Sequence, residues 1–485
     1  MFQLSDLQLP FTPKQYINGN WCGASNGKTW KVINPATEKP LIEVPFGDEA
    51  DCLLAIDAAE AAFSAWSRTN PFDRAVILKK ASALMHERLT EYAKVTVLES
   101  GKPLAEAVGE WRVSANFFEW YAEEGKRAYG SVIQASRNNK RMSVVHQPLG
   151  VIGAITAWNF PAYNPARCWS AALGAGCTVV AKVSEYTPLT GMLLAQCLHD
   201  AGLPAGVLNV VNGEPARVGE EMLRNPKIRK ISFTGSTRVG KILMDGASKT
   251  IKRLALELGG NAPVIVFPDV DVRKVAEESV LAKLRNAGQV CIAPQRYIVH
   301  ESIAKDFLHY AADRMEKIKV GNGLDPANEM GPMINSPHRD NLEKVVNSSR
   351  AAGAHIIVGG QRGKTDGYFF DPTLIETQDP NNAIFQQEIF GPVMPVIKFK
   401  TEEEAIQLAN ATTYGLASYL WTNDLKASIR ISEQIEFGMV GINEWYPQAF
   451  EAPFGGWKQS GLGYECGKDG LEEYQEKKLI SIGGL

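Results

Sequence analysis

Residues 151–240 constrain the fold most strongly, because short apolar runs alternate there with stretches that carry apolar residues at helical spacing. The apolar runs predict strands over 151–155, 177–181, 208–211 and 231–233, separated by helices that end near 175 and that cover 189–201 and 216–223. Strands and helices in this rhythm form a parallel sheet with helices on its faces. Such a sheet binds ligands beyond the carboxyl ends of its strands, where the strand order reverses.

The second half of the chain repeats this alternation and predicts a second α/β unit. Strands are expected over 263–267, 296–300, 354–358 and 395–399, with a helix over 302–318. Two amphipathic helices are expected earlier, over 51–66 and 74–99. Residues 135–145 and 478–482 are β-like, and we expect both to be edge strands that pair with another subunit. A chain of 485 residues accommodates roughly three structural units.

Charge and composition exclude several classes of protein. The formal net charge of −3 argues against binding to nucleic acid or to an anionic membrane. No stretch offers the ~18 apolar residues of a membrane span, and the N-terminus lacks a signal-peptide pattern. The seven cysteines are never spaced Cys-x-x-Cys, and the seven histidines show no metal-ligand spacing. We therefore expect a cytoplasmic protein with no metal site.

Cys291 is the candidate nucleophile. It lies in a loop punctuated by asparagine and glycine, where a thiol can be exposed and activated. A free cysteine is more often a small apolar residue of the core. The assignment therefore depends on whether other segments supply a base and an oxyanion donor.

Two further residues have the chemistry that a cysteine nucleophile needs. Glu257 stands among leucines just before Gly259 and Gly260, where loss of hydration would raise its pKa and make it a base near neutral pH. The alternative is a glutamate that faces solvent. Asn159 follows the strand over 151–155, and its side-chain amide can donate to an oxyanion.

Two turns after expected strands suit a dinucleotide. Residues 231–240 form a strand, a Gly-Ser turn and a helix start, which together present free amides to a phosphate, although Gly-x-Gly-x-x-Gly is absent. Lys182 and Glu185 follow another strand and can bind ribose hydroxyls. A carboxylate there repels a 2′-phosphate, which favours NAD over NADP. The alternatives are an ordinary turn and a local ion pair.

Seven segments, taken in chain order, resemble the aldehyde dehydrogenase superfamily over nearly the whole chain. They are residues 158–161, 182–185, 233–236, 257–260, 288–291, 388–392 and 453–456. The resemblance implies an α/β fold with a Rossmann-like cofactor domain, an α/β catalytic domain and a small β oligomerisation element. The expected boundaries are 1–124 and 148–258 for the first, 259–460 for the second, and 125–147 and 461–485 for the third. A homodimer or homotetramer is implied.

The same resemblance implies a role for each matching residue. Cys291 attacks the aldehyde, Asn159 and the Cys291 backbone amide stabilise the oxyanion, hydride passes to the nicotinamide, and Glu257 activates the water that hydrolyses the thioester. The cofactor residues implied are Thr156, Ala157, Trp158, Lys182, Ser184, Glu185, Gly213, Phe233, Gly235, Ser236, Val239, Leu258, Glu388 and Phe390.

The closest likeness is to members that oxidise succinate semialdehyde and related aldehydes with an anionic far end. Arg167 and Arg285 match positions where those members grip the substrate carboxylate, and an arginine fork suits that task. The alternative for both is a structural arginine that pairs with carboxylates or caps carbonyls. Gln448 stands where a serine is common, and Phe454 completes the expected substrate site. A sulfonated, longer or hydroxylated aldehyde therefore stays open.

Two other points limit what the resemblance implies. Glu465 matches a proton-relay glutamate, but the position of its usual lysine partner is Cys168. A coenzyme-A-acylating enzyme would tend to lack Glu257. A non-catalytic binding or structural protein on this scaffold would be expected to have lost Cys291 or Glu257, and both are present.

Overall fold

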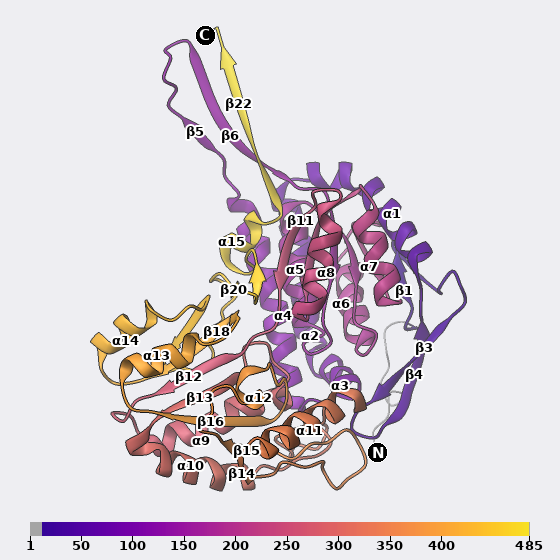
Figure 1. The fold of residues 1–485 in the computed structure, drawn as a ribbon. Helices are drawn as coiled ribbons and strands as arrows, with labels where there is room; N and C mark the ends of the chain where they lie inside the picture. The colour runs from indigo at the N-terminus through magenta and orange to yellow at the C-terminus, as the bar shows by residue number, and fades with distance from the viewer. Residues whose placement is uncertain (1–11, 485) are drawn as a thin grey trace.

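The computed structural model describes residues 12–484, in which two large β-sheets form the centres of two neighbouring units and a small sheet projects from the body (Figure 1). The first sheet has the order β2-β1-β9-β8-β7-β10-β11-β21. Its parallel strands are β7 (Val151–Ile155), β8 (Thr178–Lys182), β9 (Leu208–Val211), β10 (Ile228–Thr234) and β11 (Arg253–Glu257). Antiparallel pairing adds β1 (Gln15–Ile17), β2 (Asn20–Cys22) and β21 (Gly461–Leu462). The strand order reverses at β7, so β8 and β10 flank it.

Helices cover both faces of this sheet. One face packs on α1 (Glu49–Arg68), α7 (Pro215–Arg224) and α8 (Thr237–Ser248), and the other on α5 (Tyr163–Ala175) and α6 (Pro188–Asp200). An outer layer of α2 (Pro71–Glu87), α3 (Leu89–Ser100) and α4 (Leu104–Glu124) lies over α5 and α6. Helices α5 and α6 are therefore buried on nearly all sides, which explains why both are mostly apolar.

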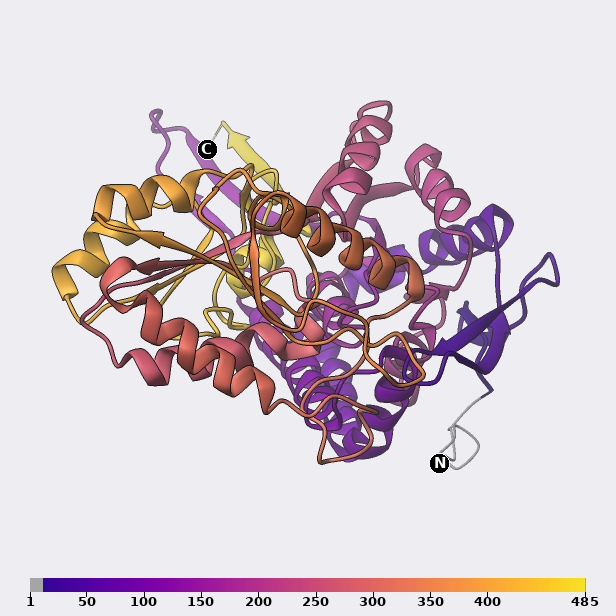
Figure 2. The same ribbon diagram turned by 60° about the horizontal axis from the view of Figure 1, so that its bottom comes forward.

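The second sheet has the order β14-β15-β16-β13-β12-β18-β19, and only β14 is antiparallel to its neighbour. Its strands are β12 (Ala262–Val266), β13 (Pro294–His300), β14 (His355–Val358), β15 (Thr373–Glu376), β16 (Val393–Phe399), β18 (Ala417–Trp421) and β19 (Met439–Ile442). Its helices, α9 (Val272–Leu284), α10 (Glu301–Glu316), α11 (Ser336–Ala351), α12 (Ala383–Gln386), α13 (Glu402–Asn410) and α14 (Leu425–Ser432), lie on both sides of it (Figure 2). The α/β fold class is confirmed.

The projecting sheet joins two segments that are far apart in the sequence. It consists of β5 (Ser131–Ile133), β6 (Lys140–Pro148) and β22 (Gln475–Gly483) in the order β22-β6-β5. Strand β6 lies between β22 and β5, so the expectation that it is an edge strand is wrong, whereas β22 is an edge strand as expected. The two β-like segments satisfy each other's backbone hydrogen bonds. Strands β22 and β5 are the edges, and Leu479, Ile480 and Val132 are exposed there.

The expected helix over 74–99 is two helices. Helix α2 ends and α3 begins at Arg88, whose φ of −93° and ψ of 5° lie outside the helical range. The Arg88 guanidinium forms an ion pair with Asp200 at 2.5 Å, and this contact connects the residue at the helix break to the end of α6. An unbroken apolar periodicity hid this break, because both helices place apolar residues against the same layer.

The remaining elements are two two-stranded sheets, a short helix and two 3-10 turns. They are β3 (Thr29–Asn34), β4 (Lys39–Pro45), β17 (Tyr414–Gly415), β20 (Trp457–Lys458) and α15 (Gly467–Glu472), with single 3-10 turns at Gly125–Arg127 and Arg285–Gly288. Within residues 12–484, no helix combines the length and apolar character needed to cross a membrane.

Candidate active site

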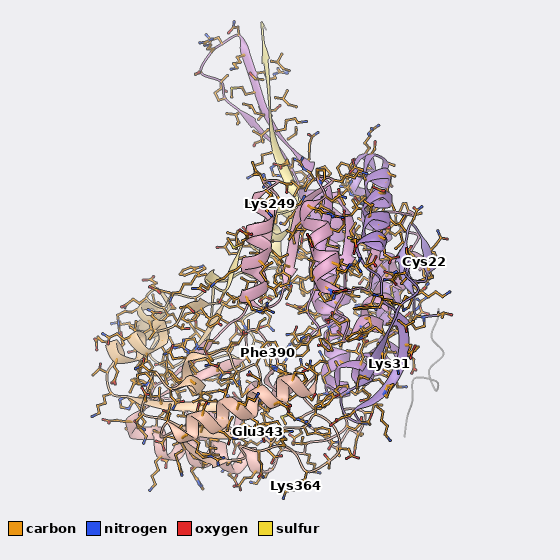
Figure 3. All side chains as sticks on the ribbon, turned by 45° about the vertical axis from the view of Figure 1, so that its right-hand side comes forward. Cys22, Lys31, Lys249, Glu343, Lys364 and Phe390 are labelled. Atoms are coloured by element: carbon orange, nitrogen blue, oxygen red, sulfur yellow. The ribbon has the colours of Figure 1, made fainter. Side chains whose placement is uncertain are left out.

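A cavity of about 260 Å³ lies between the two large sheets, at the carboxyl ends of β7, β10 and β11. The second unit closes it with Cys291, His338, Glu388 and Phe390, of which Phe390 marks the place in Figure 3. Parallel sheets bind ligands at this edge, next to the point where strand order reverses. The structure therefore brings the expected nucleophile and the expected cofactor edge together.

The backbone of the loop before Cys291 is tightly constrained. Asn286, Ala287 and Gly288 all have positive φ, at 49°, 53° and 73°. A Cβ at Gly288 would lie 2.1 Å from the Gly391 carbonyl oxygen, so only glycine fits. The buried Gln289 side chain holds the turn by donating to the Asn286 carbonyl at 3.0 Å and accepting from the Ile334 amide at 2.9 Å. This conformation leaves the Cys291 side chain partly exposed to the cavity.

Glu257 is the last residue of β11, is only 4% exposed and faces Cys291. Burial raises the pKa of the Glu257 carboxyl to about 8, while Arg167 and a hydrogen bond with Cys291 act to lower it. Burial, reinforced by the Glu257 carboxylate, also raises the pKa of the Cys291 thiol well above its ordinary value. The pair has the chemistry of a nucleophile next to a base that is active near neutral pH. A solvent-facing Glu257 is excluded.

The amide of Asn159 is aimed at the Cys291 loop. Its Nδ2 donates to the Gln289 carbonyl at 3.1 Å, and its Oδ1 accepts from Asn164 at 3.2 Å. The Asn159 backbone carbonyl accepts from Lys102 at 2.7 Å and from Asn286 at 2.9 Å. These contacts fix the orientation of the Asn159 amide, which an oxyanion donor requires.

Sequence reasoning missed the buried ion pair behind Asn159. Lys102 and Glu110 are fully buried and lie 2.5 Å apart. The other oxygen of Glu110 accepts from the Ala162 amide at 2.7 Å, so the pair holds both ends of the turn that follows β7. The available signal was a glutamate within the apolar pattern of α4, but nothing local showed what it contacts.

Twelve of the predicted cofactor residues lie along this edge of the first sheet, Glu388 and Phe390 come from the second unit, and seven of the fourteen line the cavity. Those seven are Ala157, Trp158, Gly235, Ser236, Leu258, Glu388 and Phe390. Thr156 and Phe233 are next to lining residues at the ends of β7 and β10, and the Val239 amide donates to Ser236 in the first turn of α8. Lys182 is the last residue of β8, Ser184 and Glu185 follow that strand, and Gly213 follows β9. Lys182 and Glu185 pair with each other at 2.5 Å, as the alternative interpretation had it.

The N-terminus of α8 suits a nucleotide phosphate. Ser236 caps this helix of 12 residues, and the N-terminus opens on the cavity. Glu388 accepts from the Gly260 amide at 3.0 Å, and a Cβ at Gly259 would lie 2.3 Å from its Oε2. Burial raises the pKa of Glu388 to about 7. Phe390 packs edge-on against Trp158 with ring centroids 5.6 Å apart.

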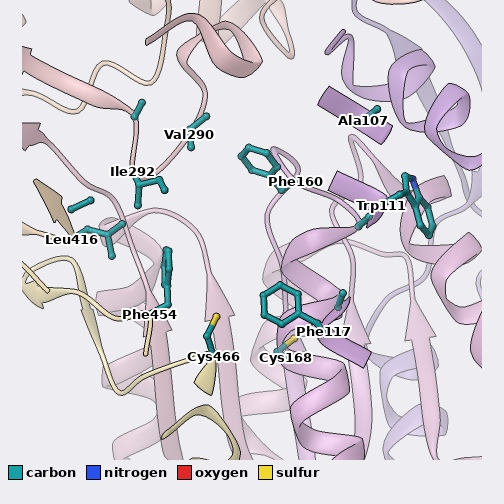
Figure 4. Close-up of a cluster of buried hydrophobic side chains, with 14 of the residues drawn as sticks. Ala107, Trp111, Phe117, Phe160, Cys168, Val290, Ile292, Leu416, Phe454 and Cys466 are labelled. Atoms are coloured by element: carbon teal, nitrogen blue, oxygen red, sulfur yellow. The ribbon is translucent and has the colours of Figure 1, made fainter. Parts of the chain in front are cut away.

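On the other side of Cys291 a narrow pocket leads to an outer cavity of about 560 Å³. Figure 4 shows Phe160 and Phe454 around this region together with Val290 and Ile292, which flank Cys291 on one loop. The predicted substrate residues Arg167, Arg285, Gln448 and Phe454 all line the narrow pocket. The Gln448 Oε1 atom is buried without a hydrogen-bond partner in the structure. Cys291 therefore lies between the cavity that suits a cofactor and a pocket lined by two arginine side chains.

The two predicted substrate arginines have different surroundings. The Arg167 side chain is 1% exposed, with Nε 2.6 Å from Glu465 Oε2 and Nη2 3.9 Å from Glu257 Oε2. Arg285 is half-buried and lies over the Phe160 and Tyr446 rings, at 5.1 and 5.6 Å. Within residues 12–484, the Arg285 guanidinium has no hydrogen bond or ion pair, although the Glu106 carboxylate is close enough to interact with it electrostatically. The sequence pattern did not distinguish these two environments.

Comparisons with known proteins agree with this geometry. A profile described as "Aldehyde dehydrogenase family" matches residues 21–480. The chain is 43% identical to mitochondrial succinate-semialdehyde dehydrogenase of Oryza sativa (97% of this chain, 89% of the relative), and 42% identical to succinate-semialdehyde dehydrogenase (NADP+) of Escherichia coli (99% and 100%). It is 40% identical to 3-sulfolactaldehyde dehydrogenase of Pseudomonas putida over 100% of both chains. The solved succinate-semialdehyde dehydrogenase of Burkholderia pseudomallei superposes with a TM-score of 0.97 at 41% identity (98% and 99%).

Proposed function

The chain belongs to the aldehyde dehydrogenase family, and from this premise we propose that it oxidises a semialdehyde with an anionic far end to the corresponding acid. The observation that carries the proposal is the position of Cys291, which lines both the cavity at the strand ends and the pocket that contains Arg285. An aldehyde bound at Cys291 can point its far end toward that cation. Succinate semialdehyde is the proposed substrate.

Cys291 reacts as its thiolate and forms a thiohemiacetal with the aldehyde. The second Nδ2 hydrogen of Asn159 and the Cys291 backbone amide stabilise the oxyanion. A bound NAD would supply the acceptor for the hydride of this adduct. The acyl group then stays on Cys291 as a thioester until Glu257 removes a proton from water that attacks it. Hydrolysis frees the thiol and gives the acid, which distinguishes this reaction from transfer to coenzyme A.

We assign the cofactor to the strand-end cavity and prefer NAD to NADP. The α8 N-terminus presents backbone amides to the cavity, as a dinucleotide phosphate requires, and Gly235, Gly259 and Glu388 line the same cavity. Lys182 and Glu185 would bind the adenosine ribose, and the Glu185 carboxylate would repel a 2′-phosphate. One relative carries NADP+ in its name, so this preference needs measurement. Replacing Glu185 by Ser should improve kcat/KM for NADP relative to NAD by about tenfold.

The substrate class is tested by a matched pair of aldehydes. Succinate semialdehyde and butanal have equal chain length and differ in the terminal carboxylate. We expect kcat/KM for the anionic member to be about 10- to 100-fold higher, in line with one or two charge-assisted hydrogen bonds. Equal values would contradict the proposal.

A sulfonated aldehyde is the second candidate. A relative named for 3-sulfolactaldehyde is 40% identical over the whole chain, and Gln448 has a buried oxygen that needs a donor such as a hydroxyl group. A higher kcat/KM for a hydroxylated, sulfonated aldehyde than for succinate semialdehyde would favour it.

The organisation of the subunit is part of the same proposal. We treat residues 1–124 and 148–258 as the cofactor domain, 259–460 as the catalytic domain, and 125–147 with 461–485 as an oligomerisation element. The free edge of β22 supports pairing between subunits in a homodimer or homotetramer. The seven cysteines are all unpaired, which suits a reducing compartment such as the cytoplasm.

A further inference from the structure

Lys102 is a buried lysine just before α4, and its ammonium group has three partners. Its Nζ lies 2.5 Å from Glu110 Oε2 and donates to the Asn159 carbonyl at 2.7 Å. It also lies 4.2 Å from the centre of the Phe160 ring. The side chains of Lys102 and Glu110 are 0% and 1% exposed. A buried ion pair is costly unless further hydrogen bonds use its remaining donors and acceptors, and here they are used on the segment that carries the proposed oxyanion donor.

Glu110 holds the start of α5. Its Oε1 accepts from the backbone amides of Ala162 and Tyr163, at 2.7 and 3.2 Å. Ala162, the N-cap of α5, has no side chain that could cap the helix, so the Glu110 carboxylate takes that role from α4. Asn164 is the second residue of α5, and its Nδ2 donates to Asn159 Oδ1 at 3.2 Å. The position of Asn164 therefore depends on Glu110.

The two branches of this network meet at Asn159. Lys102 holds its backbone carbonyl, and Asn164 binds the oxygen of its side-chain amide. With that oxygen occupied, the Asn159 Nδ2 atom faces the Cys291 loop. An oxyanion donor stabilises the transition state only if it is already in place before the reaction. A displacement of about 1 Å can cost about 100-fold in rate.

We propose that Lys102 and Glu110 are positioning residues for the oxyanion donor, with Lys102 fixing the backbone of Asn159 and Glu110 fixing its amide through the start of α5. Glu110 borders the outer cavity, but both of its oxygens are occupied by donors of the protein, so it acts through Asn159 rather than on the substrate. The inference rests on the proposed function, because it requires Asn159 to stabilise an oxyanion formed at Cys291.

A double-mutant cycle with Asn159 tests the inference. Lys102→Met and Glu110→Gln are made in the wild-type protein and in Asn159→Ala. The measurement is the rate of NADH formation in the first turnover, at saturating NAD and butanal, so that recognition of an anionic substrate does not enter. KM for NAD should stay unchanged in every variant, because neither Lys102 nor Glu110 lines the strand-end cavity.

In the wild-type background each change should slow the first turnover by about tenfold or more. Lys102→Met removes a donor to the Asn159 carbonyl, and Glu110→Gln places an amide nitrogen, which is a donor, opposite the Lys102 ammonium. In Asn159→Ala the same changes should cost less than about twofold, because the donor that they position is gone. Equal losses in the two backgrounds would overturn the inference.

The variant Lys102→Met/Glu110→Gln separates positioning from stability. Lys102→Met alone leaves a buried carboxylate without its counter-charge and is expected to destabilise the fold, whereas removal of both charges is often neutral. The paired variant should therefore melt within about 5 °C of the wild type. Its first turnover should still be about tenfold slow, because the Asn159 carbonyl has lost the Lys102 donor. A paired variant with the wild-type rate would contradict the positioning role.

Glu99 offers a matched control. It is a buried glutamate of α3 whose two oxygens accept from the Leu189 and Thr190 amides, at 2.9 and 2.7 Å, in the first turn of α6. The contact is of the same kind, but α6 carries no partner of Asn159. Glu99→Gln should leave the first-turnover rate within about twofold of the wild type. A loss as large as in Glu110→Gln would show a general effect of removing a buried carboxylate and would overturn the inference.

Failure of the proposed function gives a different result. A wild-type first turnover in Asn159→Ala would remove Asn159 from the oxyanion step, and the positioning role would fail with it. If Asn159→Ala is slow and the losses in the two backgrounds are equal, the oxyanion step stands and only the positioning role fails.

Discussion

The two cavities that meet at Cys291 are lined by different kinds of chain segment. The cofactor side is built around strand ends, two glycines and the first turn of α8, and the side chains of Trp158, Glu388 and Phe390 complete it. The substrate side consists of side chains from α4, α5, the end of α9 with the segment that leads to β13, and the loop between β19 and β20, including two arginines and several aromatic rings. Short sequence motifs determine the backbone geometry of the cofactor side, whereas single substitutions can alter the side chains of the substrate side independently of one another. We therefore expect mutations on the two sides to affect different kinetic constants.

Cys291 is shared by both cavities, so its replacement should have the largest effect. Cys291→Ala removes the atom that carries the acyl group, and aldehyde-dependent NADH formation should fall by about 10³-fold or more. Binding of NAD, followed by fluorescence, should persist because the strand-end cavity is intact. Substantial turnover by this variant would show that another residue is the nucleophile.

Glu257 should affect the step after hydride transfer. Its replacement by Gln should slow steady-state turnover by about 10²-fold or more while a first-turnover burst of NADH remains. The burst remains because the Glu257 carboxylate raises the pKa of the Cys291 thiol, and its removal makes the thiolate easier to form. A variant with the wild-type steady-state rate would remove Glu257 from the mechanism.

The pH profile provides an independent check on Glu257. Burial raises its pKa to about 8, so the base is protonated below that pH and ionised above it. Hydrolysis by the wild-type protein should therefore rise with pH through about 8, and Glu257→Gln should lack this rise. A wild-type rate that is flat over this range would contradict the assignment.

Gly259→Ala tests whether cofactor binding requires the absence of a side chain at residue 259. The added Cβ would lie 2.3 Å from Glu388 Oε2 and would displace that carboxylate. We expect KM for NAD to rise by about tenfold with little change in KM for the aldehyde. A larger effect on the aldehyde than on NAD would show that the two sides are not separable.

The smallest effect is expected on the substrate side. Tyr446→Leu removes a ring 5.6 Å from the Arg285 guanidinium while keeping an apolar side chain. A partly exposed cation–π contact is worth roughly 0.5–1 kcal/mol, so kcat/KM for succinate semialdehyde should fall about two- to fivefold. KM for NAD should stay unchanged, and an increase in KM for NAD would show that a change on the substrate side affects cofactor binding.

Most of the alternating α/β elements could be predicted from the sequence, and β7 and β9 have the predicted bounds. Short buried strands between turn residues have little freedom in where they begin and end. The break at Arg88 and the pairing of β6 with β22 could not be predicted, because each depends on a contact with a distant segment. The Lys102–Glu110 pair was missed for the same reason.

By itself the sequence determined the α/β class, the family and the residues with the chemistry of a thiol, a base and an amide donor, because these follow from local motifs and their order. Only the tertiary structure decided which charges face each other. Arg167 and Arg285 are equivalent as residue types, but packing places one between Glu257 and Glu465 and the other over two aromatic rings. Electrostatic partners depend on distances between segments that are far apart in the chain, and no local pattern encodes those distances.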